Sequence, residues 1–496
     1  MQAEQREAGV STGIAGLDHV LGKGLPAKRV YLIEGDPGAG KTTLGLQFLR
    51  DGIANGEKVL YVTLSETRAE LTAVAESHGW TLEGMDVHEL SPSEESVKPD
   101  DQYTFFHPSE VELSETTKAV LAEVDRINPS RVVFDSLSEM RLLAREPLRY
   151  RRQILGLKQF FIGRNCTVLL LDDRTSQAGD LQLQSLAHGV VTLEQLAPEY
   201  GAERRRLRII KMRGVRFQGG YHDFIIATGG LRIFPRLVAA ESRLEASHGS
   251  ASTGIQRLDA LLGGGLDRGT SSLFIGPAGA GKSAIATQIA VAAAARGEHV
   301  AMYLFDEGLE TFRRRAAGLG ADVTDHVASG HLTLTQVDPA ELSPGEFAER
   351  VRTAVVENRA SVVVIDSLNG YLNAMPEERF LLAQLHELFM FLRQHGVLAI
   401  SVVAQHGLVG QMQTPVDLSY LADNVLLLRF FEARGAVRQA ISVLKKRSGP
   451  HEKTIRELRL ESSGITVGEP LVEFQGVLTG VPVYQGRSAA PSAGGQ

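Results

Sequence analysis

The sequence has little of what would stabilise or anchor a secreted protein. It contains 496 residues but a single cysteine, Cys166. One cysteine excludes an internal disulfide framework and any zinc module built on paired cysteines. We find no apolar run of 18 or more residues and no apolar core near the first residues, so we expect neither a membrane span nor a secretion signal. We therefore expect a cytoplasmic protein in a reducing compartment.

An excess of positive charge is also missing. Lys and Arg total 52 against 59 Asp and Glu, which gives a formal net charge of −7. Proteins that bind nucleic acid usually carry a basic surface or aromatic residues among basic ones, and neither pattern stands out here, so we do not expect a nucleic-acid partner. The remaining composition, 43% hydrophobic and 22% charged, is that of an ordinary globular protein.

The two halves of the chain carry the same motifs in the same order. TGIAGLDHVLGKGL begins at Thr12 and TGIQRLDALLGGGL at Thr253, which is 241 residues later. Glycine loops at Gly35 and Gly276 keep this offset, which drops to 231 residues at RVVFDSL and VVVIDSL. This period is far too long for a solenoid repeat. We expect two domains, residues 1–240 and 241–487, followed by a disordered small-residue tail, 488–496.

Within each half, short branched apolar runs alternate with helical patterns. Runs such as VLYVTL and TVLLLDD show no polar alternation, which is typical of strands buried on both faces of a parallel sheet. The late segments RRLRIIKMRG and YHDFIIA are expected to be antiparallel strands. The fold class is therefore predicted to be α/β, a mostly parallel sheet with helices on both faces and antiparallel strands at the end of each domain.

Each half contains a complete Walker A motif, G-x4-G-K-[T/S], between an apolar strand and a helical pattern. The glycines allow backbone N–H groups to converge on phosphate oxygens, and the helix N-terminus adds partial positive charge. We expect ATP here, with the lysines at its β- and γ-phosphates. The cofactor-binding residues are then Gly35, Gly38, Ala39, Gly40, Lys41, Thr42 and Thr43, and Gly276, Gly279, Ala280, Gly281, Lys282, Ser283 and Ala284.

A magnesium ion is the second expected cofactor. The hydroxyls of Thr42 and Ser283 suit Mg²⁺ in this motif. Asp135 and Asp366 each end an apolar run, where a carboxylate can hold Mg²⁺ through water. The alternative for each aspartate is a turn cap at the strand end.

Acids and cations further along recur in both halves. Glu66 and Glu307 follow the strand after the first helix and are candidates to orient or deprotonate the attacking water, or else are solvated loop acids. Asp306 adds a second acid in the second half, where the first half has Ser65. Four cations recur downstream and are either exposed strand-edge residues or arginine-finger-like groups for a neighbour's γ-phosphate, which requires a ring: Lys211, Arg213, Lys445 and Arg447. Arg313, Arg314 and Arg315 are expected to be a solvated run.

The tandem TGxxxLD–Walker A halves, each with a late K-x-R pair, resemble the KaiC family, the circadian-clock ATPases and autokinases of the RecA superfamily. The resemblance runs over residues ~10–485. It implies two RecA-like domains in a two-tiered homo-hexamer, with ATP between subunits. The N-terminal tier would be mainly an ATPase and the C-terminal tier an autokinase. The family's paired acids fall on Ser65–Glu66 and Asp306–Glu307, and its trans-acting cations on the K-x-R pairs.

The resemblance also implies phosphorylation sites and partners. The family's adjacent Ser-Thr acceptor pair falls on Ser419 and Tyr420, and a further acceptor on Thr414. Only about a dozen residues follow VLTGVP, so we expect no KaiA-type partner, whereas a KaiB-like partner is compatible. The leading hypothesis is a KaiC-like ATP-hydrolysing ring with C-terminal serine autophosphorylation in timing or signalling. The alternative is a RecA-type DNA-associated ATPase without kinase activity.

Overall fold

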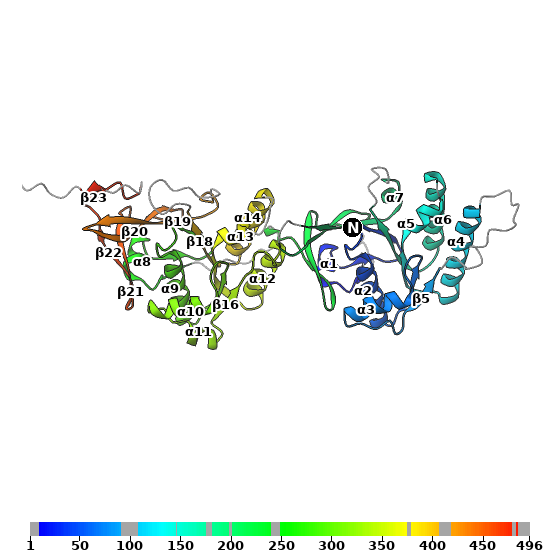
Figure 1. Ribbon diagram of the computed structural model, residues 1–496, viewed down its shortest axis with the longest axis horizontal. Coiled ribbons are helices and arrows are strands. Elements are labelled where there is room, and N and C mark those ends of the chain that lie inside the picture. Colours follow the sequence, from blue (N-terminus) through cyan, green and yellow to red (C-terminus); the bar gives the residue numbers. More distant parts are fainter. Residues whose placement is uncertain are drawn as a thin grey trace, which may run out of the picture. The chain divides into compact units, whose positions relative to one another are not determined.

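The computed structural model describes residues 9–90, 108–144, 146–174, 181–197, 201–239, 249–373, 378–405, 418–478 and 483–484. The chain divides into two compact units, Met1–Arg236 and Leu237–Gln496 (Figure 1). Each unit contains a nine-stranded sheet with helices packed against it. The predicted duplicated α/β fold, two tandem RecA-like domains, is therefore confirmed. No helix in the described ranges is long and apolar enough to cross a membrane.

The sheet of the first unit has the order β11-β10-β9-β8-β3-β7-β6-β4-β5. The six strands from β5 to β8 are parallel, and β9, β10 and β11 continue the sheet antiparallel. The strands are β3 Val30–Gly35, β4 Val59–Thr63, β5 Asp86–Glu89, β6 Arg131–Asp135, β7 Thr167–Asp173, β8 Gly189–Leu196, β9 Arg204–Met212, β10 Tyr221–Ala227 and β11 Gly230–Phe234; β1 Gly9–Val10 and β2 Leu25–Pro26 form a separate pair. The helices are α1 Ala15–Val20, α2 Lys41–Ala54, α3 Arg68–Ser77, α4 Pro108–Ile127, α5 Leu137–Ala144, α6 Pro147–Ile162 and α7 Leu181–Leu186.

The second unit repeats this topology as β16-β15-β17-β18-β14-β19-β20-β21-β22. The strands are β14 Ser271–Gly276, β15 His299–Leu304, β16 Leu332–Gln336, β17 Ala360–Asp366, β18 Leu398–Ala404, β19 Asn424–Ala433, β20 Ala436–Lys446, β21 Arg456–Glu461 and β22 Gly464–Pro470, with short pairs β12 Ser250–Ala251 with β13 Leu266–Asp267 and β23 Phe474–Gln475 with β24 Val483–Tyr484. The helices are α8 Gln256–Leu261, α9 Lys282–Ala295, α10 Leu309–Gly318, α11 Thr324–Ala328, α12 Pro344–Val356, α13 Leu368–Asn373 and α14 Glu378–Gln394.

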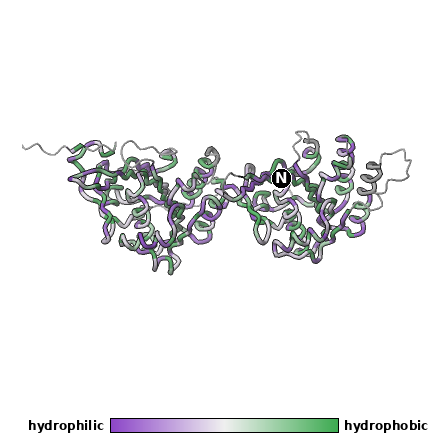
Figure 2. Tube along the Cα trace, viewed as in Figure 1, coloured by the Kyte–Doolittle hydropathy of each residue, from purple (hydrophilic) through white to green (hydrophobic). Residues whose placement is uncertain are grey.

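Each sheet is buried on both faces, as the apolar runs predict. Neighbouring residues of β3 show this, because Tyr31 packs into the cluster that contains α2 while Leu32 packs into the cluster that contains α4 and α6. The second unit has the same two layers, with α8, α9 and α10 on one face and α12, α13 and α14 on the other. Figure 2 shows hydrophobic stretches of the chain, in green, running through each unit. The parallel strands therefore form rigid supports for the loops at their carboxyl ends.

A buried arginine lies within the first unit. Arg131 begins β6 and is 2% exposed. Its guanidinium pairs with Asp51 at 2.9 Å and with Glu57, and donates to the carbonyl of Phe48 at 2.8 Å. Glu298 of the second unit stands 241 residues after Glu57 and obtains its counter-charge from Arg268 and Arg296 instead. The two halves thus neutralise the same acid with arginines from different elements.

Candidate nucleotide-binding sites

Both glycine loops connect the carboxyl end of a central strand to the first turn of a helix. Gly40 and Gly281 precede α2 and α9 and adopt left-handed backbone conformations, with φ of 98° and 101°. A Cβ atom at Gly40 would also lie 2.6 Å from Ile226 Cδ1, which is closer than packed carbon atoms approach. The loops therefore require glycine, and they present a helix N-terminus to a phosphate-sized ligand.

The two Walker lysines have different surroundings. Lys41 Nζ donates to the carbonyls of Gly35 and Asp36, both at 2.9 Å, and pairs with Asp173 Oδ1 at 2.7 Å. Lys282 Nζ donates to the carbonyl of Pro277 at 2.6 Å, and burial lowers the pKa of its ammonium to about 8. Strand registers place Asp173 opposite Gly35, and Ala404 opposite Gly276. Only the first unit therefore places a carboxylate at this strand position.

A hydroxyl and a carboxylate meet beside each loop. Thr42 Oγ1 donates to Asp135 Oδ2 and Ser283 Oγ donates to Asp366 Oδ1, each at 3.0 Å. Burial raises the pKa of both aspartates. In the first unit, Tyr61 Oη also donates to Asp135 Oδ2 at 2.5 Å. These hydroxyl and carboxylate oxygens are of the kind that Mg²⁺ prefers, and phosphates and water would have to supply its other ligands.

In the described part of the chain, protein ligands alone do not form a metal centre. Among the described residues, no group of three or more His, Cys, Asp or Glu side chains is suited to hold a metal ion. A magnesium ion at either hydroxyl–carboxylate pair would therefore depend on the phosphates of the nucleotide.

The predicted water-activating acids differ between the units. Glu66 Oε2 is buried and has no hydrogen-bond partner within the described part of the chain. Burial, followed by the charges of Asp135 and Glu70, raises the pKa of this carboxyl. Glu307 is instead held by Arg315, whose Nη2 lies 2.8 Å from Glu307 Oε2. The Glu66 carboxylate is thus available for proton transfer, whereas the Glu307 carboxylate is engaged.

The other second-unit acid is also hydrogen-bonded. Asp306 Oδ2 accepts a hydrogen bond from Ser367 Oγ, next to Asp366. This contact places Asp306 beside the hydroxyl–carboxylate pair of its own unit. The expectation of a solvated arginine run is wrong for Arg315, since its guanidinium is held by an acid that the sequence assigned to catalysis.

The recurrent cations lie at the opposite end of each sheet from the Walker loop of the same unit. Lys445 Nζ donates to the carbonyls of Ser419 and Ala422, at 2.9 and 2.8 Å. The loop before β19 meets the start of β14, because the Asp423 N–H donates to the Ser271 carbonyl at 2.8 Å. Since β14 rises about 3.3 Å per residue, its six residues separate this region from the Walker loop by roughly 17 Å.

The other three cations, Lys211, Arg213 and Arg447, also bind groups at the end of the sheet opposite the Walker loop. Lys211 donates to the carbonyl of Gln184, and Arg213 donates to the carbonyl of Ser185 at 2.9 Å. Arg447 pairs with Asp423 at 3.2 Å. Tyr420 is exposed, and Thr414 lies outside the described residues. Within the described part of the chain, the partners of these cations therefore lie at the end of each sheet opposite the Walker loop.

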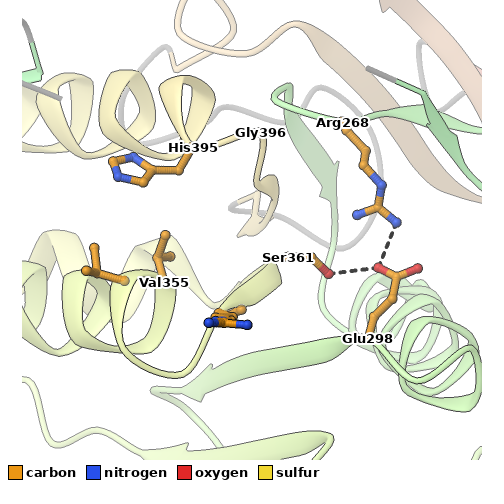
Figure 3. Close-up of a pocket in the computed structure, with 9 residues that line it drawn as sticks. Arg268, Glu298, Val355, Ser361, His395 and Gly396 are labelled. Atoms are coloured by element: carbon orange, nitrogen blue, oxygen red, sulfur yellow. Dashed lines mark hydrogen bonds and ion pairs between the residues drawn. The ribbon is translucent and has the colours of Figure 1, made fainter. Parts of the chain in front are cut away.

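A cavity of about 460 Å³ in the second unit is separate from this chemistry. It is lined at the amino ends of β17 and β18 by residues that include Ala360, Ser361 and Gly396. Figure 3 shows Arg268 and Ser361 directed at Glu298, which accepts from both, with His395 on the other side. Nucleotide-binding loops lie at the carboxyl ends of parallel strands, so this cavity is not the phosphate site.

Two site residues escaped the sequence reasoning. Asp173 ends the run TVLLLDD, and a strand-end acid next to the Walker strand is a signal that could have been read. Arg315 gave no such signal, because it stands in a run of three arginines that the sequence predicts to be solvated, and its neighbours Arg313 and Arg314 are indeed exposed. Its role depends on the way α10 folds back toward Glu307, which sequence spacing alone does not reveal.

A largely parallel sheet, a Walker A loop at its carboxyl end and a strand-end aspartate beside the loop, all present twice, define a tandem P-loop ATPase of the RecA type. The sequence matches the family described as "ATPase: KaiC" over residues 10–238 and 251–472. The chain belongs to the KaiC family.

Named relatives agree with this assignment. The chain is 25% identical over 489 residues to the circadian clock oscillator protein KaiC of Parathermosynechococcus lividus, covering 95% of this chain and 87% of that protein. It is 27% identical over 486 residues to the circadian clock protein KaiC3 of Synechocystis sp. (strain PCC 6803), covering 97% and 95%. These full-length matches to clock proteins do not favour the alternative of a DNA-associated ATPase.

Proposed function

We propose that this protein is an ATP-hydrolysing homo-hexameric ring with serine autophosphorylation in its C-terminal unit, acting in circadian-type timing or signalling in the cytoplasm. The observation that carries the proposal is the separation of each Walker loop from the recurrent cations of the same unit. Beyond the Walker lysine, the charge that develops on the γ-phosphoryl group is stabilised by further cations close by, and a group roughly 17 Å away in the same unit does not supply one. A neighbouring subunit would complete the site if the amino ends of its sheet strands, where its cations lie, faced this Walker loop.

In the N-terminal unit, hydrolysis would use Glu66. Lys41 and the loop N–H groups would hold the phosphates, and Thr42 with Asp135 would hold Mg²⁺, which when bound would neutralise charge on the phosphoryl group. Glu66 accepts a proton from the attacking water as the bond from the γ-phosphate to ADP breaks. The raised pKa of this carboxyl brings it nearer to neutral pH, which suits a general base. Lys211 and Arg213 of a neighbouring subunit would stabilise the developing charge.

In the C-terminal unit, the acceptor would be Ser419. Its hydroxyl attacks the γ-phosphate of a neighbour's ATP, ADP leaves, and the proton passes to Asp306 or Glu307 of that neighbour. Lys282, Ser283 and Asp366 would hold the phosphates and Mg²⁺ of that ATP. Ser419 belongs to the same short segment as the Lys445 contacts, so the cation and the acceptor would arrive together. Tyr420 and Thr414 are secondary acceptor candidates.

The relatives suggest a class of partner only through the family to which they belong. The relatives are named as clock proteins, so a KaiB-like partner is proposed here. A KaiA-type partner is not proposed.

Subunit mixing tests the interface. Lys41→Ala subunits lack a phosphate cation, and Arg213→Ala subunits lack the cation for their neighbour. Mixed rings should recover N-terminal hydrolysis, because some interfaces then carry both wild-type groups. A monomer with full activity in light scattering, or mixtures no more active than the separate variants, would contradict the ring.

Intact-mass analysis after incubation with Mg-ATP tests the kinase step. Wild-type protein should gain phosphate, and Ser419→Ala should lose most of it while N-terminal hydrolysis continues. Tyr420→Phe is the matched control, because it removes the adjacent hydroxyl, and it should retain most phosphate. Equal labelling of Ser419→Ala and wild type would exclude this acceptor.

A further inference from the structure

The arginine that holds Glu307 has no counterpart in the first unit. Arg315 Nε lies 3.2 Å from both carboxylate oxygens of Glu307, and Nη2 lies 2.8 Å from Oε2. A guanidinium that binds both oxygens of a carboxylate fixes its orientation as well as its charge. Glu307 stands 241 residues after Glu66, and the residue 241 positions before Arg315 is Val74. Val74 packs against the core and carries no charge.

The ion pair lies beside the phosphate chemistry. Burial raises the pKa of Asp366, and the charge of Arg315 is near enough to oppose that rise. Both partners are about a quarter exposed, at 27% for Arg315 and 25% for Glu307, so neither is a freely solvated surface group. Arg315 is anchored on α10, so the carboxylate is held from outside the Walker loop.

We propose that Arg315 is a positioning residue that holds Glu307 away from the attacking water and thereby slows ATP hydrolysis in the C-terminal unit. This inference rests on the proposed ATPase function. A general base must reach the water with a free lone pair. The guanidinium occupies one edge of the Glu307 carboxylate, and the remaining lone pairs stay open. Hydrolysis is therefore slowed rather than abolished, and ATP persists as a phosphoryl donor.

The test uses full-length protein that carries Lys41→Ala, so that remaining hydrolysis comes from the C-terminal sites. In this background Arg315→Val, which installs the residue type of Val74, should raise kcat by on the order of tenfold, part of the 10²- to 10⁴-fold that a general base supplies. KM should stay nearly constant, because the contact that is removed acts on the chemical step. Arg314→Val is the matched control and should leave kcat unchanged.

A second substitution separates this role from a structural one. Glu307→Gln added to Arg315→Val should remove the gain, because the released carboxylate is then absent. Arg315→Lys keeps the charge but not the fork of donors, so it should give an intermediate kcat even if the valine variant folds poorly. Nucleotide stoichiometry measured on each variant verifies that its sites are intact.

Two results would overturn the inference. A lower kcat in both Arg315→Val and Arg315→Lys would mean that the arginine assists the reaction, and a gain that survives Glu307→Gln would mean that Glu307 is not the group released. The proposed function fails differently, since protein without these substitutions would then bind ATP at both units and release no phosphate from either.

Discussion

The ion pair between Lys41 and Asp173 gives the two ATP sites different expected affinities. ATP binding requires Lys41 to turn from its resting partners toward the phosphates. In the first unit it must leave a carboxylate 2.7 Å away, and in the second unit the matching position is Ala404. Asp173→Ala removes this competitor and should tighten ATP binding at the N-terminal site.

The magnitude follows from the burial of the pair. A hydrogen bond to a charged group contributes about 1.5–3 kcal/mol, and a fully exposed ion pair about 0–1 kcal/mol. Lys41 is 8% exposed and Asp173 is 33% exposed, so the pair lies between these limits. A net value of about 1–2 kcal/mol corresponds to roughly a 5- to 30-fold decrease in Kd.

The assay is a titration with a fluorescent ATP analogue in protein that carries Lys282→Ala, so that N-terminal sites dominate binding. Asp173→Ala is compared with its parent under the same Mg²⁺ and salt. The reciprocal control is Ala404→Asp in a Lys41→Ala background, which should weaken binding at the C-terminal site by a similar factor. Binding is measured rather than turnover, because the carboxylate is also close enough to the phosphates to affect chemistry. An unchanged or higher Kd in Asp173→Ala would refute the competition argument.

Three further predictions concern other groups. Glu66→Gln in a Lys282→Ala background should lower kcat for phosphate release by about a hundredfold with little change in KM, because the amide cannot accept the proton. Retention of more than half the wild-type rate would exclude Glu66 as the base. In a Lys41→Ala background, ATP affinity at the C-terminal site should fall about tenfold between pH 7 and 9. The pKa of Lys282 is lowered to about 8 in the free protein and bound phosphates require the charged lysine, so ATP binding takes up a proton above pH 8. An affinity that does not change with pH would contradict this linkage. Arg131→Met should destabilise the first unit by about 3 kcal/mol in chemical denaturation, because Asp51 and Glu57 lose their shared counter-charge; a loss below 1 kcal/mol would mean that solvent satisfies both acids.

Much of the fold was predictable because the chain is built from strong local signals. Apolar runs such as VLYVTL are buried on both faces in the structure, as the absence of alternation predicts. The antiparallel strands after β8 were predicted from RRLRIIKMRG and YHDFIIA. Those after β19 agree with the expectation that each domain ends in antiparallel strands. The Walker loops stand out because glycine is the residue that tolerates the left-handed backbone before α2 and α9.

The site was less predictable where long-range contacts decide it. In the sequence, the second half has two adjacent acids, Asp306 and Glu307, where the first half has Ser65 and Glu66. The structure engages both of them, while the lone Glu66 keeps an unpartnered oxygen within the described residues. Such differences arise from side chains that meet across elements, and sequence spacing carries no record of those meetings. The catalytic and phosphorylation roles therefore remain predictions.

The buried arginine of the first unit limits how the two halves can be recombined. Arg131 stands opposite Val59, and the matching strand position of the second unit is Val362, opposite Val300. A chimaera that exchanged β6 for β17 would place valine beside Asp51 and Glu57, the two acids that Arg131 neutralises. It would also place arginine beside Glu298, which already pairs with two arginines. The acid itself is the same in both halves, Glu57 and Glu298, and only the arginines that neutralise it differ. The units should therefore tolerate exchange as whole domains but not strand by strand.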